Sequence, residues 1–158
     1  MDRIRQLARK WGTRIRKRSC IDYAFNGQTI AELDASEKPK RRSDSNLIHD
    51  IAHFVIAAPE RRTMLEFGLG DSPDTTRIGL PRAKGMTASA AQQEEELVSA
   101  LGIYWEREFG LDWKKTYEDH SWVGPFMKGP TKENEIFDFN ATHKFAKQLQ
   151  ELRRRQII

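Results

Sequence analysis

Cysteine is almost absent from this chain of 158 residues, which contains only Cys20. One thiol cannot form an intrachain disulfide, and it cannot supply the several thiolates of a structural zinc site. Long hydrophobic runs are missing as well, since none approaches the roughly 20 residues that cross a bilayer. The first residues also lack the apolar stretch of a secretory signal. We therefore expect a cytoplasmic protein without a transmembrane segment.

Several functional signatures are missing too. The sequence contains no P-loop, no RNA-stacking aromatic motif, no internal repeat and no low-complexity tract. Its length fits one domain whose hydrophobic core needs no disulfide to hold it together. We expect a basic amphipathic helix at 1–18, followed by a single domain at 19–158.

Positive charge is concentrated at the N-terminus. Residues 1–18 hold eight Lys or Arg against one Asp, so this arm carries about +7 and the rest of the chain about −3. Apolar residues recur among these cations at helical spacing, which predicts a cationic amphipathic helix. Such a helix either packs its apolar stripe on the domain or presents its cations to an acidic protein, nucleic acid or membrane surface. The cations that we expect at such a contact are Arg14, Arg16, Lys17 and Arg18.

A short β-hairpin is predicted after this arm. Asn26-Gly27 separates two apolar-alternating runs and favours a type I′ turn, with strands near 20–25 and 28–33. The segment at 46–58 is apolar nearly all round, which predicts a buried central helix. A mainly helical α+β domain with a small N-terminal sheet is the expected fold class.

A second long helix is expected from Ser89, where Gln92 completes a capping-box pattern, to Gly110 as the residue after its C-terminus. The loop before it is rich in Gly and Pro. The other expected features are one short strand at 76–80, an irregular segment at 111–138 and a final helix at 140–155.

The run HDIAH lies within the buried helix. Residues four apart lie on one face of a helix, so His49 and His53 can place two imidazole nitrogens on one metal ion. Two histidines in an apolar helix are costly to bury unless their nitrogens are satisfied. The alternative is a pair of hydrogen-bonded core histidines, without a metal.

A third ligand is needed, because catalytic metal sites combine about three protein ligands with open positions. The acids Glu94, Glu95 and Glu96 lie at the start of the second long helix. At about 100° per residue, Glu94 falls within the apolar stripe, Glu95 at its edge and Glu96 on the far side. Periodicity alone therefore favours Glu94 as the inward acid.

The run from Leu47 to Gly68, LIHDIAHFVIAAPERRTMLEFG, resembles the core motif of the elongation factor P hydroxylase family. The matching features are His49, His53, Phe54, Ile56-Ala57, Arg61-Arg62 and Glu66-Phe67-Gly68. The resemblance implies a zincin-like fold and a site for Fe(II) made of two histidines and one carboxylate. It places the carboxylate at Glu95, which we favour, with Glu94 kept as the reserve. It also implies hydroxylation of a protein side chain, with a translation factor as a candidate substrate.

Asp50 separates this reading from a zincin-like hydrolase. A peptidase that uses Zn(II) needs a general base after the first histidine, and Asp50 is one methylene shorter than the usual Glu. A displacement on the order of 1 Å can cost about 10²-fold in rate, which weighs against a peptidase. In an oxygenase, Asp50 would instead orient a ligand or a water molecule. A non-catalytic adaptor that binds through its basic helix is the third reading.

Other candidate residues give weaker signals. His143 is an alternative ligand, or a capping or surface residue, and His120 is isolated in sequence. Arg61 and Arg62 either bind an acidic substrate or close the dipole of the buried helix.

Overall fold

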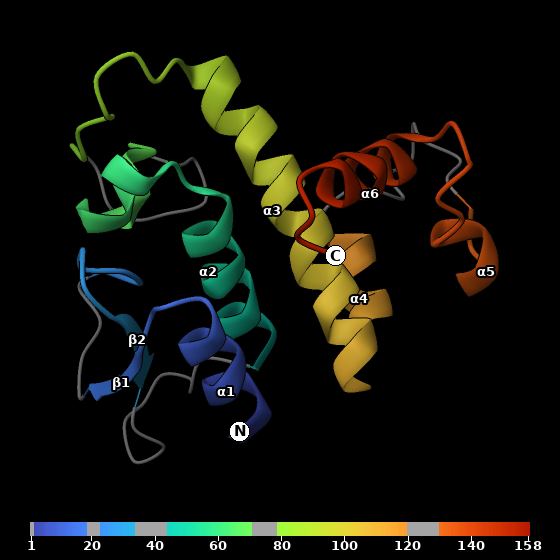
Figure 1. The fold of residues 1–158 in the computed structure, drawn as a ribbon, viewed down its shortest axis with the longest axis horizontal. Coiled ribbons are helices and arrows are strands. Elements are labelled where there is room, and N and C mark those ends of the chain that lie inside the picture. The colour runs from blue at the N-terminus through green and yellow to red at the C-terminus, as the bar shows by residue number, and fades with distance from the viewer. Residues whose placement is uncertain (1, 19–22, 34–43, 71–78, 120–129) are drawn as a thin grey trace. The chain divides into compact units, whose positions relative to one another are not determined.

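The computed structural model describes residues 2–18, 23–33, 44–70, 79–119 and 130–158 (Figure 1). Two strands, β1 (Ile15–Arg18) and β2 (Ile30–Leu33), form a parallel sheet. The helices of these ranges are α1 (Asp2–Lys10), α2 (Asp44–Ile56), α3 (Ala88–Phe109), α4 (Trp113–Asp119), α5 (Glu133–Ile136) and α6 (Lys144–Arg154), with the 3₁₀ helices η1 (Pro59–Thr63) and η2 (Glu66–Gly68). The expected α+β class, mainly helical with a small sheet, is confirmed.

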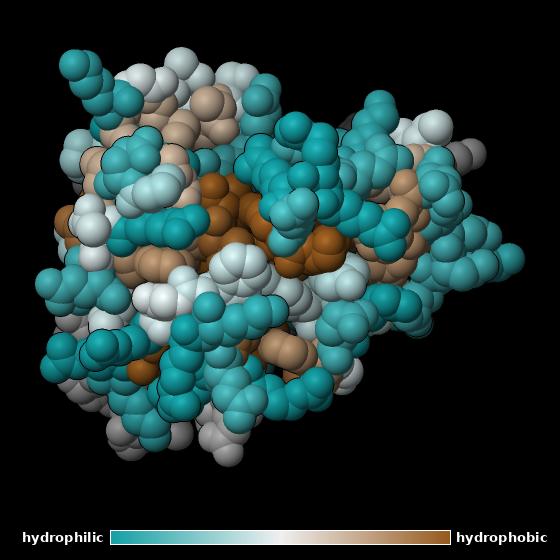
Figure 2. All heavy atoms as spheres, in the orientation of Figure 1, coloured by the Kyte–Doolittle hydropathy of each residue, from teal (hydrophilic) through white to brown (hydrophobic). Residues whose placement is uncertain are grey.

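Two compact units make up the chain, Met1–Glu95 and Glu96–Ile158, and we describe each by itself. Hydrophilic side chains cover most of the face seen in Figure 2, in keeping with a sequence that is 32% charged. None of the helices in the described ranges is long and apolar enough to cross a membrane.

Helix α2 is the core of the first unit, as its sequence predicts. It contacts α1 and β2, and its apolar residues are buried on several sides of the helix. The buried apolar residues of α2 are Leu47, Ile48, Ile51, Ala52, Val55 and Ile56. Helix α1 contributes the buried stripe Ile4, Leu7 and Ala8. Because α2 is surrounded in this way, its polar residues must find partners inside the unit.

The N-terminal helix ends at Lys10, so the prediction of a helix over 1–18 is wrong for its second half. Gly12 (φ 86°) follows the helix, its N–H donates to Arg9 O, and the N–H of Thr13 donates to Ala8 O. This pair of bonds is a Schellman motif, in which glycine adopts the left-handed conformation that ends a helix. The chain then continues as β1, in register with β2 from Ile15↔Ile30 to Arg18↔Leu33.

The predicted hairpin is reduced to a turn. Phe25 and Ile30 form an isolated antiparallel bridge, whereas the strand that follows pairs in parallel with β1. The side chain of Asn26 accepts hydrogen bonds from the N–H groups of Gln28 and Thr29 at 3.0 and 2.9 Å. Of the two central residues only Gly27 has a positive φ, so the turn is not type I′. Residues 20–22 of the expected first strand lie outside the described ranges.

Aromatic residues form the core of the second unit. The rings of Trp113, Tyr117, Phe137 and Phe145 meet edge to face, with centroids 5.1 to 6.4 Å apart. These residues come from α4, from the end of α5 and from α6. The prediction of an irregular segment at 111–138 is therefore wrong where the structure describes it, because two short helices interrupt it.

Helix termini differ by a few residues from their predicted positions. Thr87, not Ser89, caps α3, since its hydroxyl accepts from the N–H of Ala90 at 3.1 Å. The predicted C-terminus is confirmed: Gly110 has φ 71° and follows Phe109. The last helix begins at Lys144 rather than at residue 140. Most of the expected strand at 76–80 lies outside the described residues.

Gly27 offers a test of the contact between this turn and η1. A Cβ built on Gly27 would lie 2.5 Å from the carbonyl oxygen of Thr63, whereas one on Gly12 meets nothing within 4 Å. The two glycines have nearly equal φ, 85° and 86°. We expect Gly27→Ala to lower the free energy of unfolding by about 1–2 kcal/mol more than Gly12→Ala does. Urea unfolding of both variants measures this, and equal losses would contradict the contact.

Candidate metal centre

Three side chains that the sequence singles out lie together in the first unit. Nε2 of His49 is 3.0 Å from Oε1 of Glu95, and Nε2 of His53 is 3.1 Å from Oε2. One ligand atom from each of the three residues lies within 4.8 Å of the other two, a group that can hold a metal ion. Helix α2 supplies both histidines and α3 supplies the carboxylate.

The histidines reach a common point because one helical turn separates them. Their ring centroids are 4.8 Å apart and their planes cross at 82°. The ring of Phe67 stacks on His53 with centroids 5.3 Å apart and an angle of 15°. The ring of Phe25 stacks in turn on the ring of Phe67, with centroids 4.2 Å apart. This column of rings limits the rotation of His53.

The donor set and its spacing fit a metal ion. Two imidazole nitrogens and one carboxylate are ligands of iron, zinc and related divalent ions. Adjacent ligands held about 2.1 Å from an ion, at right angles, are about 3.0 Å apart, which matches both nitrogen–carboxylate distances. The same distances also suit N–H groups of two histidines donating to one carboxylate. The distances alone therefore suit either a metal ion bound by these nitrogens or protons carried by them.

Charge coupling within the group changes the pKa of two members. Burial of His53 opposes its charged form, but Glu95 above all, with Asp50 and Glu94, outweighs burial and raises its pKa above 6.5. Burial opposes the charged form of Glu95 as well, but His53 and His49 lower its pKa far below the ordinary value of 4.5. The carboxylate is therefore ionised at neutral pH and ready to bind a cation.

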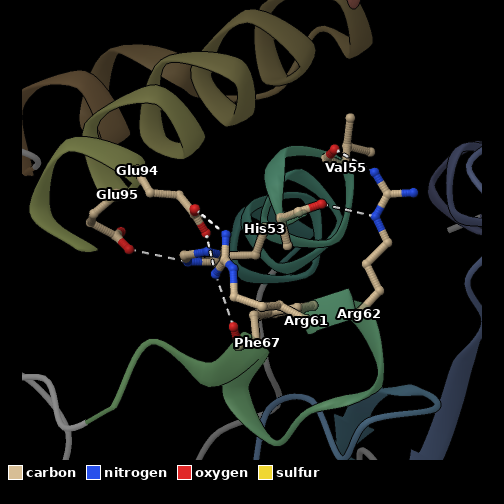
Figure 3. A network of polar contacts seen from close by, with 8 residues as sticks. His53, Val55, Arg61, Arg62, Phe67, Glu94 and Glu95 are labelled. Carbon is tan, nitrogen blue, oxygen red and sulfur yellow. Dashed lines mark hydrogen bonds and ion pairs between the residues drawn. The ribbon is translucent and has the colours of Figure 1, made fainter. Parts of the chain in front are cut away.

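Glu94, the reserve ligand, has a different partner. Both of its carboxylate oxygens accept from the guanidinium of Arg61, with 3.0 Å between Nη1 and Oε1 (Figure 3). Arg61 is only 7% exposed, and Nη1 also donates to the carbonyl oxygen of Phe67 at 2.9 Å. The structure thus brings Glu95, not Glu94, to the histidines.

Neither Arg61 nor Arg62 is placed as the expected contact for an acidic substrate. Arg61 is buried and forms an ion pair with Glu94. Arg62 donates hydrogen bonds to the carbonyl oxygens of Ala57 and Val55, each at 3.0 Å. Those carbonyls belong to the C-terminal end of α2 and the residue after it, which lack partners within the helix. Arg62 therefore closes the end of the histidine-bearing helix, which is the alternative that the sequence left open.

The segment Glu66-Phe67-Gly68 has a role that the sequence alone did not reveal. Glu66 and Phe67 have φ of 43° and 56°, values that residues other than glycine rarely adopt. The carboxylate of Glu66 accepts from the N–H groups of Ala24 and Phe25 and so holds this conformation. Strained backbone of this kind persists only where surrounding contacts enforce it, often beside functional sites. In the sequence, this segment was marked by the Glu-Phe-Gly that matches the motif of the elongation factor P hydroxylase family.

Asp50, the expected catalytic or orienting acid, is buried beside the histidines. It is 6% exposed, and its charge contributes to the raised pKa of His53. Within the described part of the chain, the buried Nδ1 of His53 has no hydrogen-bond partner. Asp50 therefore does not orient His53 through the Nδ1 bond that metal-bound histidines usually make.

The remaining candidates have other contacts or stay predictions. His143 caps α6, since Nδ1 accepts from the N–H of Ala146 and Nε2 lies 3.1 Å from Glu135 O. It is not a member of the metal-binding group, so its role as an alternative ligand is not supported. Arg14, Arg16 and Lys17 are exposed on or beside β1, and their contact with an acidic partner stays a prediction. The side chain of Arg18 and all of His120 lie outside what the structure describes.

The fold and site thus define an α+β protein with a His-x-x-x-His and glutamate group that can hold a metal. Comparison with family models, curated proteins and solved structures finds no match for this chain. The resemblance to elongation factor P hydroxylases accordingly depends on residues 47–68 and the position of Glu95, and the function must be argued from the site itself.

Metal affinity should depend on pH through His53. Because its pKa is raised above 6.5, a metal must displace a proton from its ring below that pKa, whereas Glu95 stays ionised. We expect the affinity for Co(II) to weaken by at least about tenfold for each pH unit below the pKa of His53, because the site contains two imidazole ligands, and to weaken much less above it. Titrations between pH 5.5 and 8.5 measure this. An affinity that does not change over this range would contradict binding at His53.

Proposed function

We propose that this protein is a metal-dependent hydroxylase that acts on a protein side chain, with His49, His53 and Glu95 as ligands of a non-haem Fe(II). The observation that carries the proposal is the convergence of two Nε2 atoms and one carboxylate, 3.0 and 3.1 Å apart. Two histidines and one carboxylate are the ligand set of non-haem iron oxygenases. The resemblance of residues 47–68 to elongation factor P hydroxylases supports the same class.

The chain's own residues would hold the ion, and the three ligands differ in how far they are exposed. Iron bound to such a set supplies the redox and dioxygen chemistry of these enzymes. His53 is the most buried ligand, its side chain 9% exposed, followed by His49 at 22% and Glu95 at 39%. The accessible side is therefore that of Glu95, and a side chain carried by another protein can approach from there.

A hydrolase would need Asp50 as its base, and the burial of Asp50 weighs against this. A base must reach the attacking water within about 2.6–3.2 Å, directly or through one water molecule. Asp50 is 6% exposed, far less than the side chain of Glu95 at 39%, so solvent water has little access to it. This observation supports the hydroxylase over the zinc peptidase.

Metal analysis tests the ligand set directly. We expect anaerobically purified protein to contain close to one equivalent of iron, and less after aerobic purification, because Fe(II) is oxidised. The His49→Ala/His53→Ala variant should contain none, since one carboxylate alone holds a divalent ion weakly. An equal absence of metal from both proteins would refute the proposal.

The Asp50→Asn variant separates the two enzyme classes. In a hydroxylase the metal content should stay at the wild-type level, because the amide has almost the same shape and Asp50 is not a ligand. In a zinc peptidase, loss of the base would abolish peptide cleavage by the Zn(II)-loaded protein. Mass spectrometry of a peptide library incubated with both Zn(II)-loaded proteins makes the comparison. Cleavage by the wild type that Asp50→Asn removes would favour the peptidase.

A further inference from the structure

We infer that Arg61 is a positioning residue of the metal site, which fixes the turn of α3 that carries Glu95 through its ion pair with Glu94. The inference rests on the proposed function, because it takes His49, His53 and Glu95 to be metal ligands. Arg61 itself touches neither histidine ring in any described contact, so its effect must pass through its partners.

The first contact acts on the third ligand. Arg61 binds both oxygens of Glu94, and a two-point pair fixes the orientation of a carboxylate as well as its position. The pair is well shielded from water, with the side chains of Arg61 and Glu94 9% and 12% exposed. Glu95 is the next residue along the helix, so the rotation of α3 that suits Arg61 also directs Glu95 toward α2.

The second contact acts on a histidine. Nη1 of Arg61 donates to the carbonyl oxygen of Phe67, whose ring stacks on His53. Phe67 holds a positive φ of 56°, a conformation that needs outside support. Figure 3 shows one guanidinium bonded both to Glu94 and to the carbonyl of Phe67. Arg61 therefore supports both the residue whose ring restrains His53 and the helical turn that carries Glu95.

Two neighbours offer matched controls for this role. Arg62 is the adjacent cation, but it donates to backbone carbonyls at the end of α2. Glu96 is the adjacent acid on the other side of Glu95, and it pairs with Lys144 of the second unit. Both residues take part in ion pairs or hydrogen bonds of the fold, yet neither has a described contact with Phe67 or with the pair of Arg61 and Glu94.

The experiment must separate positioning from stability, because removing one partner leaves the other charge buried. The variant is therefore Arg61→Met/Glu94→Met, which replaces the whole pair by apolar side chains, a change that often preserves folding. Arg62→Met and Glu96→Gln are the controls. Each protein is titrated with Co(II), whose visible absorption reports the number and geometry of ligands, and its thermal unfolding is recorded without metal.

We expect the double variant to unfold within a few degrees of the wild type but to bind Co(II) about 10- to 100-fold more weakly, the range seen when residues that orient ligands are removed. Its absorption should also differ from that of the wild type, because Glu95 is no longer held. Arg62→Met and Glu96→Gln should keep the wild-type affinity and spectrum. A folded double variant with wild-type affinity and spectrum would overturn the inference.

Two further comparisons complete the test. If the double variant does not fold, Arg61→Lys keeps the charge but loses the two-point pair, and it should bind Co(II) more weakly than Arg62→Lys does. Equal affinity of these two variants would count against the positioning role. Absence of Co(II) binding by the wild type would refute the metal site itself, an outcome distinct from binding that Arg61 does not influence.

Discussion

Imidazole nitrogens inside an apolar helix need polar partners, and the first unit meets this need at the Nε2 atoms of His49 and His53, although Nδ1 of His53 has no partner among the described residues. His53 is 7% exposed on α2, where an unsatisfied nitrogen would cost on the order of 1–3 kcal/mol. Glu95 meets both Nε2 atoms and brings a negative charge into the same region. That charge in turn favours any bound cation, whether two protons or one metal ion. The competition between proton and metal at one set of atoms is therefore built into the site.

A second acid beside the first has to be neutralised separately. Glu94 lies in the same helical turn as Glu95 and is more buried, and Arg61 pairs with it in a region nearly closed to water. Periodicity in the sequence was therefore right that Glu94 is the more buried acid. It could not identify the partner, because η1 supplies Arg61 from a segment whose path depends on Pro59, on the turn at Gly27 and on Glu66. The resemblance selected Glu95 by matching helices residue by residue, which periodicity cannot do.

The sequence predicted local features better than pairings between distant segments. The buried helix α2, the face shared by His49 and His53 and the end of α3 at Gly110 follow from spacing and glycine chemistry. The parallel pairing of β1 with β2 does not, because IRKR resembles the continuation of a basic helix and its partner lies fifteen positions further along. In the sequence, Gly12 was the signal that the N-terminal helix ends before this strand. The ion pair of Arg5 with buried Glu32 ties α1 to β2 after that break.

The three consecutive glutamates of α3 have consequences for how this sequence can vary. Glu94 pairs with an arginine, Glu95 with two histidines and Glu96 with a lysine. Successive glutamates are about 100° apart around the helix. Inserting or deleting one residue between Thr87 and Glu94 would turn Glu94 and Glu95 away from their partners together, whereas Glu96 and Lys144 both follow the change and keep their pair. The exposed residues of that stretch, such as Gln92 and Gln93, are free to change identity, whereas its length is not. In related sequences, gaps should therefore be rarer there than substitutions.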